Sequence, residues 1–191
     1  MKDENKDLSA EQSLALISGM IRQAQGNVSY STKYILLWGW CIALANLGMY
    51  GLMKFSTYPH PYVVWLITIP ATIVSIIYGI KEGKEKITHS HLDKITMWLW
   101  LSLFFIIPPV ITFGYKINFQ INPVILLLTA FPTFITGIIL RFKPLLVGGI
   151  CFWACSIICF MVDAQTQMLL GALAVITGYL IPGYLLKRIK V

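Results

Sequence analysis

The fold is decided by the stretch Thr133-Phe-Ile-Thr-Gly-Ile-Ile-Leu-Arg-Phe-Lys-Pro-Leu-Leu-Val147. At its centre, Arg141-Phe-Lys143 forms a short basic hinge between two long apolar runs, residues 123–140 and 144–162. At a rise of about 1.5 Å per residue, a helix over either run is about long enough to cross a hydrocarbon layer roughly 30 Å thick. The stretch therefore predicts a membrane hairpin that turns on the side where cations gather.

The composition of the whole chain agrees with this interpretation. Of the 191 residues, 57% are apolar and only 12% are charged. In a typical soluble domain, about a quarter of the residues are charged. The longest polar stretch is residues 1–33, so we expect no separate soluble domain in this sequence. The sequence predicts an all-α, polytopic membrane protein.

Six apolar segments are predicted to cross the membrane as helices. Pro61, Pro123 and Pro144 stand where a helix begins, a position that tolerates a missing backbone N–H. The six predicted spans are residues 34–53, 62–80, 95–115, 123–140, 144–162 and 167–186. We accordingly divide the chain into a cytoplasmic N-terminal segment (1–33), a six-helix transmembrane domain (34–186) and a cytoplasmic tail (187–191).

The N-terminal segment is predicted to contain an amphipathic helix from Ser9 to about Gln25. Ser9 followed by Gln12 fits a capping box, and Gly26-Asn27 supplies a stop signal. The residues that share the apolar face are Leu14, Ile17, Ile21 and Ala24. We expect this helix to lie on the membrane surface or to pack beneath the bundle; the alternative is that it binds a partner protein.

Lys and Arg are distributed unevenly between the two predicted sides of the membrane. Of the 15 in the chain, only Lys54 and Lys116 lie on one side, and all the others lie on the side of the termini. The hinge and tail cations that mark this side are Arg141, Lys143, Lys187 and Arg188. Because cytoplasmic loops carry the excess of Lys and Arg, we expect both termini in the cytoplasm. The same cations predict contact with anionic lipid headgroups.

Neutral polar side chains and prolines are the best functional indication in the spans. No Asp, Glu, Lys, Arg or His lies centrally in a predicted span, although proton-coupled carriers usually depend on such residues. Pro70 and Pro132 free backbone carbonyls near mid-membrane, where transporters place binding sites on broken helices. The candidate residues of a substrate path are Asn46, Thr68, Pro70, Thr72, Ser75, Thr129, Pro132, Thr133 and Thr136. The alternative is that the hydroxyls bond neighbouring helices or their own i−4 carbonyls.

Three cysteines, Cys151, Cys155 and Cys159, are spaced four apart and share one face of the fifth predicted span. Thiolates bind soft metals such as Cu(I) and Zn, so this row is a candidate metal site. Packing is the stronger interpretation, because small residues at this spacing let membrane helices approach closely. Apart from such a metal, the sequence predicts no cofactor.

Two tryptophan pairs indicate a faint internal repeat. Trp38-Gly-Trp40 and Trp98-Leu-Trp100 each begin the first helix of a predicted hairpin. Aromatic residues at the edges of any row of membrane hairpins provide the alternative explanation. Trp153 falls in the middle of a span, and we expect it to pack between helices.

Five short segments stand out along the chain: Gln12-Ser-Leu-Ala-Leu-Ile17, Leu37-Trp-Gly-Trp40, Ile77-Tyr-Gly-Ile-Lys81, Gly137-Ile-Ile-Leu-Arg-Phe-Lys-Pro-Leu145 and Ile181-Pro-Gly-Tyr-Leu-Leu186. Together they resemble a group of small six-span inner-membrane proteins from Bacteroidetes-type bacteria. The resemblance covers nearly the whole chain and implies six spans in a bacterial inner membrane. It carries no assigned activity, so no site residue is transferred.

The sequence lacks a nucleophile–base pair, a Gly-rich phosphate loop and a metal-protease signature, so we do not expect an enzyme. The leading hypothesis is a regulatory or scaffolding subunit that acts through helix contacts and its cytoplasmic face. Its partners would be lipid and a second copy of the chain or another membrane or cytoplasmic protein, and we expect no nucleic acid. The alternatives are a small transporter or channel for an uncharged or hydrophobic solute, and copper handling.

Overall fold

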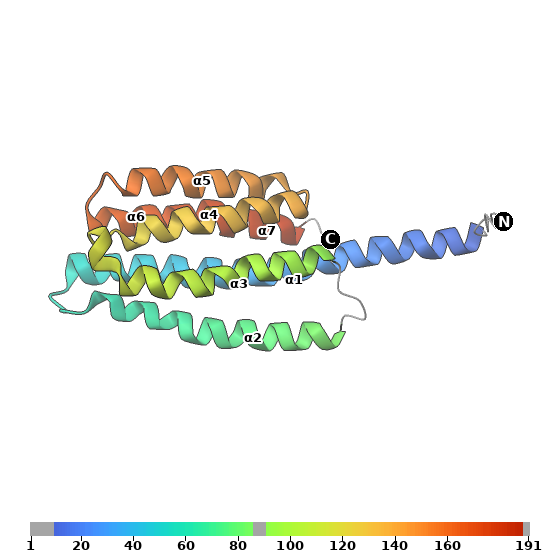
Figure 1. Cartoon of the computed structure of the whole chain (residues 1–191), viewed down its shortest axis with the longest axis horizontal. Helices are drawn as coiled ribbons and strands as arrows, with labels where there is room; N and C mark the ends of the chain where they lie inside the picture. Colours follow the sequence, from blue (N-terminus) through green and yellow to red (C-terminus); the bar gives the residue numbers. More distant parts are fainter. Residues whose placement is uncertain (1–9, 86–90, 189–191) are drawn as a thin grey trace.

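The computed structural model describes residues 10–85 and 91–188, and every regular element in these residues is a helix. The helices run side by side along one axis (Figure 1). The α-helices are α1 (Ala10–Phe55), α2 (Thr68–Glu85), α3 (His91–Thr112), α4 (Ile121–Ile139), α5 (Lys143–Cys159), α6 (Ala164–Val175) and α7 (Ile181–Arg188). Two 3-10 helices, η1 (Pro61–Ile67) and η2 (Gly114–Ile117), and one π-helical segment, η3 (Ile176–Leu180), complete the chain. The prediction of an all-α, polytopic membrane protein is confirmed.

The number of helices that can span a membrane differs from the prediction. In the part of the chain that the structure describes, five helices are long and apolar enough: Thr32–Phe55, Pro61–Lys81, Lys94–Thr112, Ile121–Ile139 and Ala164–Arg188. The predicted span 144–162 instead forms α5, an apolar helix of 17 residues. At a rise of about 1.5 Å per residue, α5 is shorter than the roughly 30 Å hydrocarbon layer. It ends at Cys159, because the chain turns there toward Asp163, which caps α6.

The largest departure from the prediction concerns α1. The expected amphipathic helix was to end at Gly26-Asn27, but the backbone is helical without interruption through 46 residues. A glycine in a helix interior costs only about 1 kcal/mol relative to alanine, so an established helix can continue through it. Figure 1 shows the N-terminal part of α1 projecting beyond the end of the bundle. Ser9, the predicted N-cap, lies outside the described residues.

The packed core is made by α1, α4, α5, α6 and η3. Its most deeply buried hydrophobic side chains are Ala45, Ala130, Leu145, Phe152, Cys159, Ala174, Val175 and Tyr179. Helix α2 packs mainly on α1, and α3 packs mainly on α4. Among the described side chains of these two helices, only Ala71 and Leu103 are buried. The exposed apolar side chains of α2 and α3 are accommodated by lipid, which is as apolar as they are.

The basic hinge forms where the sequence predicts it, between the end of α4 and the start of α5 at Lys143. Arg141 adopts the left-handed region with φ of 51°. The N–H of Phe142 then donates to the carbonyl of Gly137 at 2.9 Å, the bond that closes a Schellman helix end. Phe142 is only 8% exposed, so its ring anchors the turn in the core.

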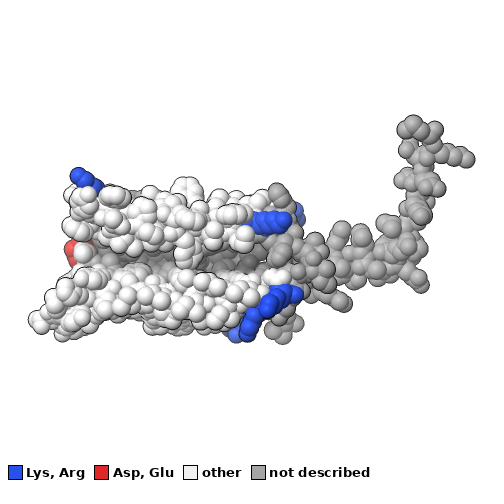
Figure 2. Space-filling view, turned by 60° about the horizontal axis from the view of Figure 1, so that its bottom comes forward, with Lys and Arg blue, Asp and Glu red and all other residues white. Residues whose placement is uncertain are grey.

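Basic side chains gather at one end of the bundle. In Figure 2, most of the described Lys and Arg lie at the end from which α1 projects. This end holds the last turns of α2 and α7, with Lys84, Lys187 and Arg188, and the Arg141 turn. Lys54 and Asp163 belong to the opposite end, where α1 ends and α6 begins. The structure therefore groups the described cations as the sequence predicts.

Candidate functional site

The candidate hydroxyls of α4 lie in the packed interior. Thr129, Thr133 and Thr136 are all buried, as is Pro132. The hydroxyl of Thr129 donates to the carbonyl of Ile125 at 2.7 Å, and that of Thr136 accepts the indole N–H of Trp100 at 3.1 Å. The Thr136 hydroxyl joins α4 to α3, and the Thr129 hydroxyl bonds the backbone of its own helix. Such bonds are the alternative that the sequence offers to a substrate path.

The centre of this face is a hydroxyl pair between Thr133 and Tyr179, 3.0 Å apart. Because the Thr133 hydroxyl donates to the carbonyl of Thr129 at 2.7 Å, the Tyr179 hydroxyl is the donor to Thr133. The Tyr179 ring is 2% exposed and contacts Phe152, with ring centroids 4.9 Å apart. Sequence analysis missed Tyr179, although a tyrosine in the middle of an apolar span is a signal for a buried polar contact.

A local irregularity in the backbone brings Tyr179 into this position. Pro182 has no N–H, so it cannot bond the carbonyl of Gly178 four residues before it. The helix widens into the π-helical segment η3 at this point. Gly178 lies against Gly148 of α5: a Cβ on Gly148 would be 2.6 Å from the Gly178 carbonyl oxygen. The two backbones therefore touch without intervening side chains.

The candidate residues of α2 are separate from those of α4. Thr68 and Thr72 donate to backbone carbonyls of their own turn, at 2.7 Å to Trp65 and 2.8 Å to Thr68. Ser75 accepts the indole N–H of Trp38 at 3.0 Å and so ties α2 to α1. Pro70 is exposed and lines a pocket between α1 and α2. The structure does not bring the two sets together into one site.

Two tryptophan bonds join helix pairs in a similar way, but they do not follow the register of the internal repeat, because Trp38 is the first member of its pair and Trp100 is the second. Trp38 and Ser75 are 37 residues apart, and Trp100 and Thr136 are 36 apart. In each case the first helix of a hairpin donates an indole N–H to a hydroxyl on the second. Trp153 lies between helices as expected, because its ring contacts Phe131 and Phe134 of α4.

Asn46 is the most unusual polar side chain in the bundle. It is 1% exposed, and its Nδ2 donates to the carbonyl of Ile42 at 2.9 Å. Its Oδ1 is buried without a hydrogen-bond partner among the described residues. That oxygen lies against Gly171 of α6, where a Cβ would be 2.6 Å from it. An acceptor left in this state costs free energy, so Asn46 is a candidate for a functional residue.

Two of the three cysteines of α5 pack as small side chains in the core or against it. Cys159 is fully buried, with its Sγ 3.9 Å from the carbonyl of Gln167, and Cys155 packs against the core. Within residues 10–85 and 91–188, no three His, Cys, Asp or Glu side chains lie close enough to hold a metal ion. The structure therefore gives the predicted soft-metal site on Cys151, Cys155 and Cys159 no geometric basis.

Asp163 has a structural role at the start of α6. Its Oδ2 accepts the backbone N–H of Gln165 at 3.0 Å and of Thr166 at 3.2 Å, and its Oδ1 accepts the Thr166 hydroxyl at 2.7 Å. The Thr166 hydroxyl is the main cause that lowers the pKa of Asp163 below its ordinary value, and the N–H groups add to it. The cap thus stabilises the fold above the ordinary pKa of a carboxyl and is lost as pH falls through the lowered one.

No protein-family profile matches the sequence, and neither a curated protein nor a solved structure matches it. The fold alone therefore defines the class. The chain is an all-α, polytopic membrane protein whose central hydroxyl groups are engaged in packing.

The hydroxyl pair gives a prediction on stability. Tyr179→Phe and Thr133→Val should each lower the free energy of unfolding, and the double variant should lose less than their sum. The expected coupling energy is about 0.6 kcal/mol, the average for hydrogen bonds between membrane helices, and at most about 1.7 kcal/mol. A double-mutant cycle from equilibrium unfolding in mixed detergent measures it. Additive losses would show that the two hydroxyls do not stabilise each other.

Proposed function

We propose that the chain is a non-enzymatic regulatory or scaffolding subunit that acts through helix contacts. The observation that carries this proposal is α1. One uninterrupted helix packs against α2, α6 and α7 and also extends beyond the bundle (Figure 1). A contact made on its outer part is therefore connected to the packed core by continuous helical backbone.

The interior supports this function better than it supports transport. A transporter of uncharged solutes would need its hydroxyls free to exchange bonds with the solute. On α4, the Thr133 and Thr136 hydroxyls instead bond other helices, and the Thr129 hydroxyl bonds a carbonyl of its own helix. The arrangement of the cysteines likewise favours packing over copper handling.

The cations at one end support a cytoplasmic location for that end. Cytoplasmic loops carry the excess of Lys and Arg, so in this proposal both termini lie in the cytoplasm. The membrane is a bacterial inner membrane. The resemblance to small inner-membrane proteins of Bacteroidetes-type bacteria supports the same location. The projecting part of α1, with the last turn of α2 and the first turn of α3, then faces a cytoplasmic partner. Residues 86–90, between α2 and α3, lie outside the described part of the chain.

Site-specific photo-crosslinking in native membranes tests the proposal. A photoreactive residue at position 17, in place of Ile17, should give one adduct of reproducible mass, because this position belongs to the apolar face of the sequence pattern. The same probe in place of Ser18 is the matched control and should give none. Leu14→Asp should abolish the adduct from position 17. An adduct of twice the mass of the chain would identify the partner as a second copy.

Two outcomes would contradict the proposal. One is a chain that gives no adduct from either position in native membranes. The other is an adduct that forms equally from positions 17 and 18, since a specific helix contact depends on the face that is presented.

A further inference from the structure

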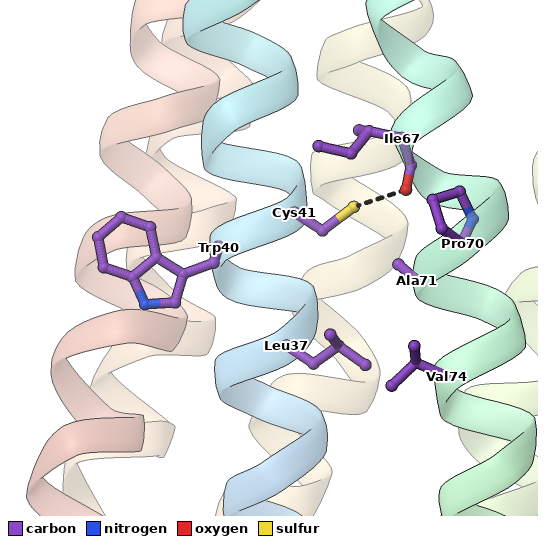
Figure 3. A pocket seen from close by; sticks show the side chains of 7 residues that line it. All are labelled: Leu37, Trp40, Cys41, Ile67, Pro70, Ala71 and Val74. Carbon is purple, nitrogen blue, oxygen red and sulfur yellow. Dashed lines mark hydrogen bonds between the residues drawn. The ribbon is translucent and has the colours of Figure 1, made fainter.

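Helix α1 contacts η1 toward one end of a long seam and α2 toward the other, where the bond from Trp38 to Ser75 also joins the two helices. Toward one end, a Cβ on Gly48 would be 2.9 Å from Val64 of η1. Toward the other, the rings of Tyr34 and Tyr78 meet edge to face with centroids 6.2 Å apart. Between these contacts lies a pocket of about 280 Å³ (Figure 3). Its lining residues are Leu37, Trp40, Cys41, Ile67, Pro70, Ala71 and Val74.

The chemistry of the lining selects hydrocarbon. The lining side chains are apolar apart from the Cys41 thiol, which donates to the carbonyl of Ile67 at 3.6 Å, and the Trp40 indole N–H. The indole N–H is engaged as well, because it bonds the Tyr184 hydroxyl of α7 at 3.0 Å. An acyl chain here gains van der Waals contacts with the lining, whereas a polar ligand finds no free partner among these side chains.

Beside the pocket, α1 exposes an apolar strip, and the helices α2 and α7 pack against α1; we call this strip and its two flanking helices the furrow. Figure 3 shows Trp40 on the side of α1 away from α2. Leu44 and Leu47, which are 49% and 44% exposed, continue the face of Leu37 and Trp40 along α1. This apolar strip is exposed, so lipid chains have access to the pocket along the furrow.

At the basic end of the bundle, the furrow is flanked by a lysine on each side. Lys81 follows Val74 by seven residues on one face of α2, about 10 Å farther along the helix axis. On the other side, Lys187 follows Tyr184 by three residues in the last turn of α7. One leaflet supplies about 15 Å of hydrocarbon, half of the layer, so an acyl chain whose headgroup lies at these lysines reaches the pocket.

We propose that this furrow binds one anionic phospholipid, with an acyl chain in the pocket and the phosphate beside Lys81 and Lys187. The apolar lining matches the acyl chain of such a lipid, and the exposed lysines on α2 and α7 match its phosphate. A zwitterionic lipid offers the same chain without the net charge. The site should therefore prefer the anionic lipid by about five-fold for each lysine that contributes. This inference requires only that the bundle spans a bilayer and is independent of the proposed partner.

Electron paramagnetic resonance tests the site on the full chain in phosphatidylcholine vesicles. A trace of spin-labelled phosphatidylglycerol or phosphatidylcholine is added, with the label in the middle of one acyl chain. The spectrum reports the fraction of the labelled lipid whose motion the protein restricts. The unmodified protein should restrict phosphatidylglycerol at least about five-fold more strongly than phosphatidylcholine. Val74→Trp fills the pocket and should remove this preference.

Matched variants separate the chain from the headgroup. Ile73 is 54% exposed and does not line the pocket. Ile73→Trp therefore adds the same side chain outside the pocket and should leave the preference for phosphatidylglycerol unchanged. Lys81→Gln with Lys187→Gln should reduce phosphatidylglycerol to the level of phosphatidylcholine. The lysine variants do not touch the core, so they remain informative if Val74→Trp fails to fold.

Three results would overturn the proposal. They are equal restriction of the two lipids by the unmodified protein, equal behaviour of folded Val74→Trp and Ile73→Trp, and an unchanged preference in the lysine double variant. The last of these would mean that the phosphate does not lie at this end of the furrow.

Discussion

Replacing Gly148 with valine is expected to lower the free energy of unfolding by about 3 kcal/mol, near the upper end of the usual cost of overpacking. A Cβ at this position would lie 2.6 Å from the carbonyl oxygen of Gly178 and 2.9 Å from its Cα. Both are backbone atoms, which cannot rotate away as the end of a side chain can. Helix α5 would have to move from η3 and would disturb the packing of Phe152 on Tyr179.

The control for this experiment is Gly51→Val. Both glycines lie within helices, so the change in helix propensity is the same, but a Cβ on Gly51 meets no heavy atom of the described residues within 4 Å. Equilibrium unfolding in mixed detergent compares the two variants. Equal losses of stability would show that the close approach of Gly148 and Gly178 is not what the valine disturbs.

The second large effect is expected from Asn46→Asp, which should cost about 3 kcal/mol or more at neutral pH, as an uncompensated buried charge does. The shape of the side chain is nearly unchanged. However, the donor that bonds the Ile42 carbonyl is replaced by an oxygen, and Oδ1 has no partner to stabilise a negative charge. The loss should shrink in acid, because a protonated carboxyl is neutral and can donate to Ile42 again.

Asn118→Asp provides the matched control, because Asn118 is exposed in the turn that follows η2. The same chemical change there should alter the free energy of unfolding by no more than about 0.5 kcal/mol, as usual for surface substitutions. Thermal unfolding of both variants across a range of pH measures the difference. If Asn46→Asp is tolerated at neutral pH, either the buried carboxyl is protonated there or a donor or solvent reaches it in the folded protein.

The sequence was sufficient to predict the class of fold because membrane insertion depends on local composition. The apolar runs, the Arg141 hinge and the distribution of Lys and Arg can all be read without knowing which helices are neighbours. The continuity of α1 could not be read in this way. Gly26-Asn27 has the local chemistry of a helix end, but helix propagation through 46 residues outweighs that preference. The end of α5 was also missed, because the Asp163 cap fixes it from outside the apolar run.

The candidate site was predictable only in part. Helical periodicity places Thr129, Thr133 and Thr136 on one face, but it does not say which helix that face meets. The partner of Thr133 is 46 residues away, in a segment that is displaced by the π-helical turn before Pro182. For the same reason, nothing in the sequence marks the Oδ1 of Asn46 as unpaired, since that depends on its contact with Gly171.

The continuity of α1 has a mechanical consequence. From the start of the first apolar span at Thr32, the helix extends 22 residues outward to Ala10 and 23 residues inward to Phe55. At about 1.5 Å per residue, the two arms of this lever are nearly equal, roughly 33 and 35 Å long. Because the inner arm packs against α2, α6 and α7, a sideways force on the outer tip would be passed to these helices as well.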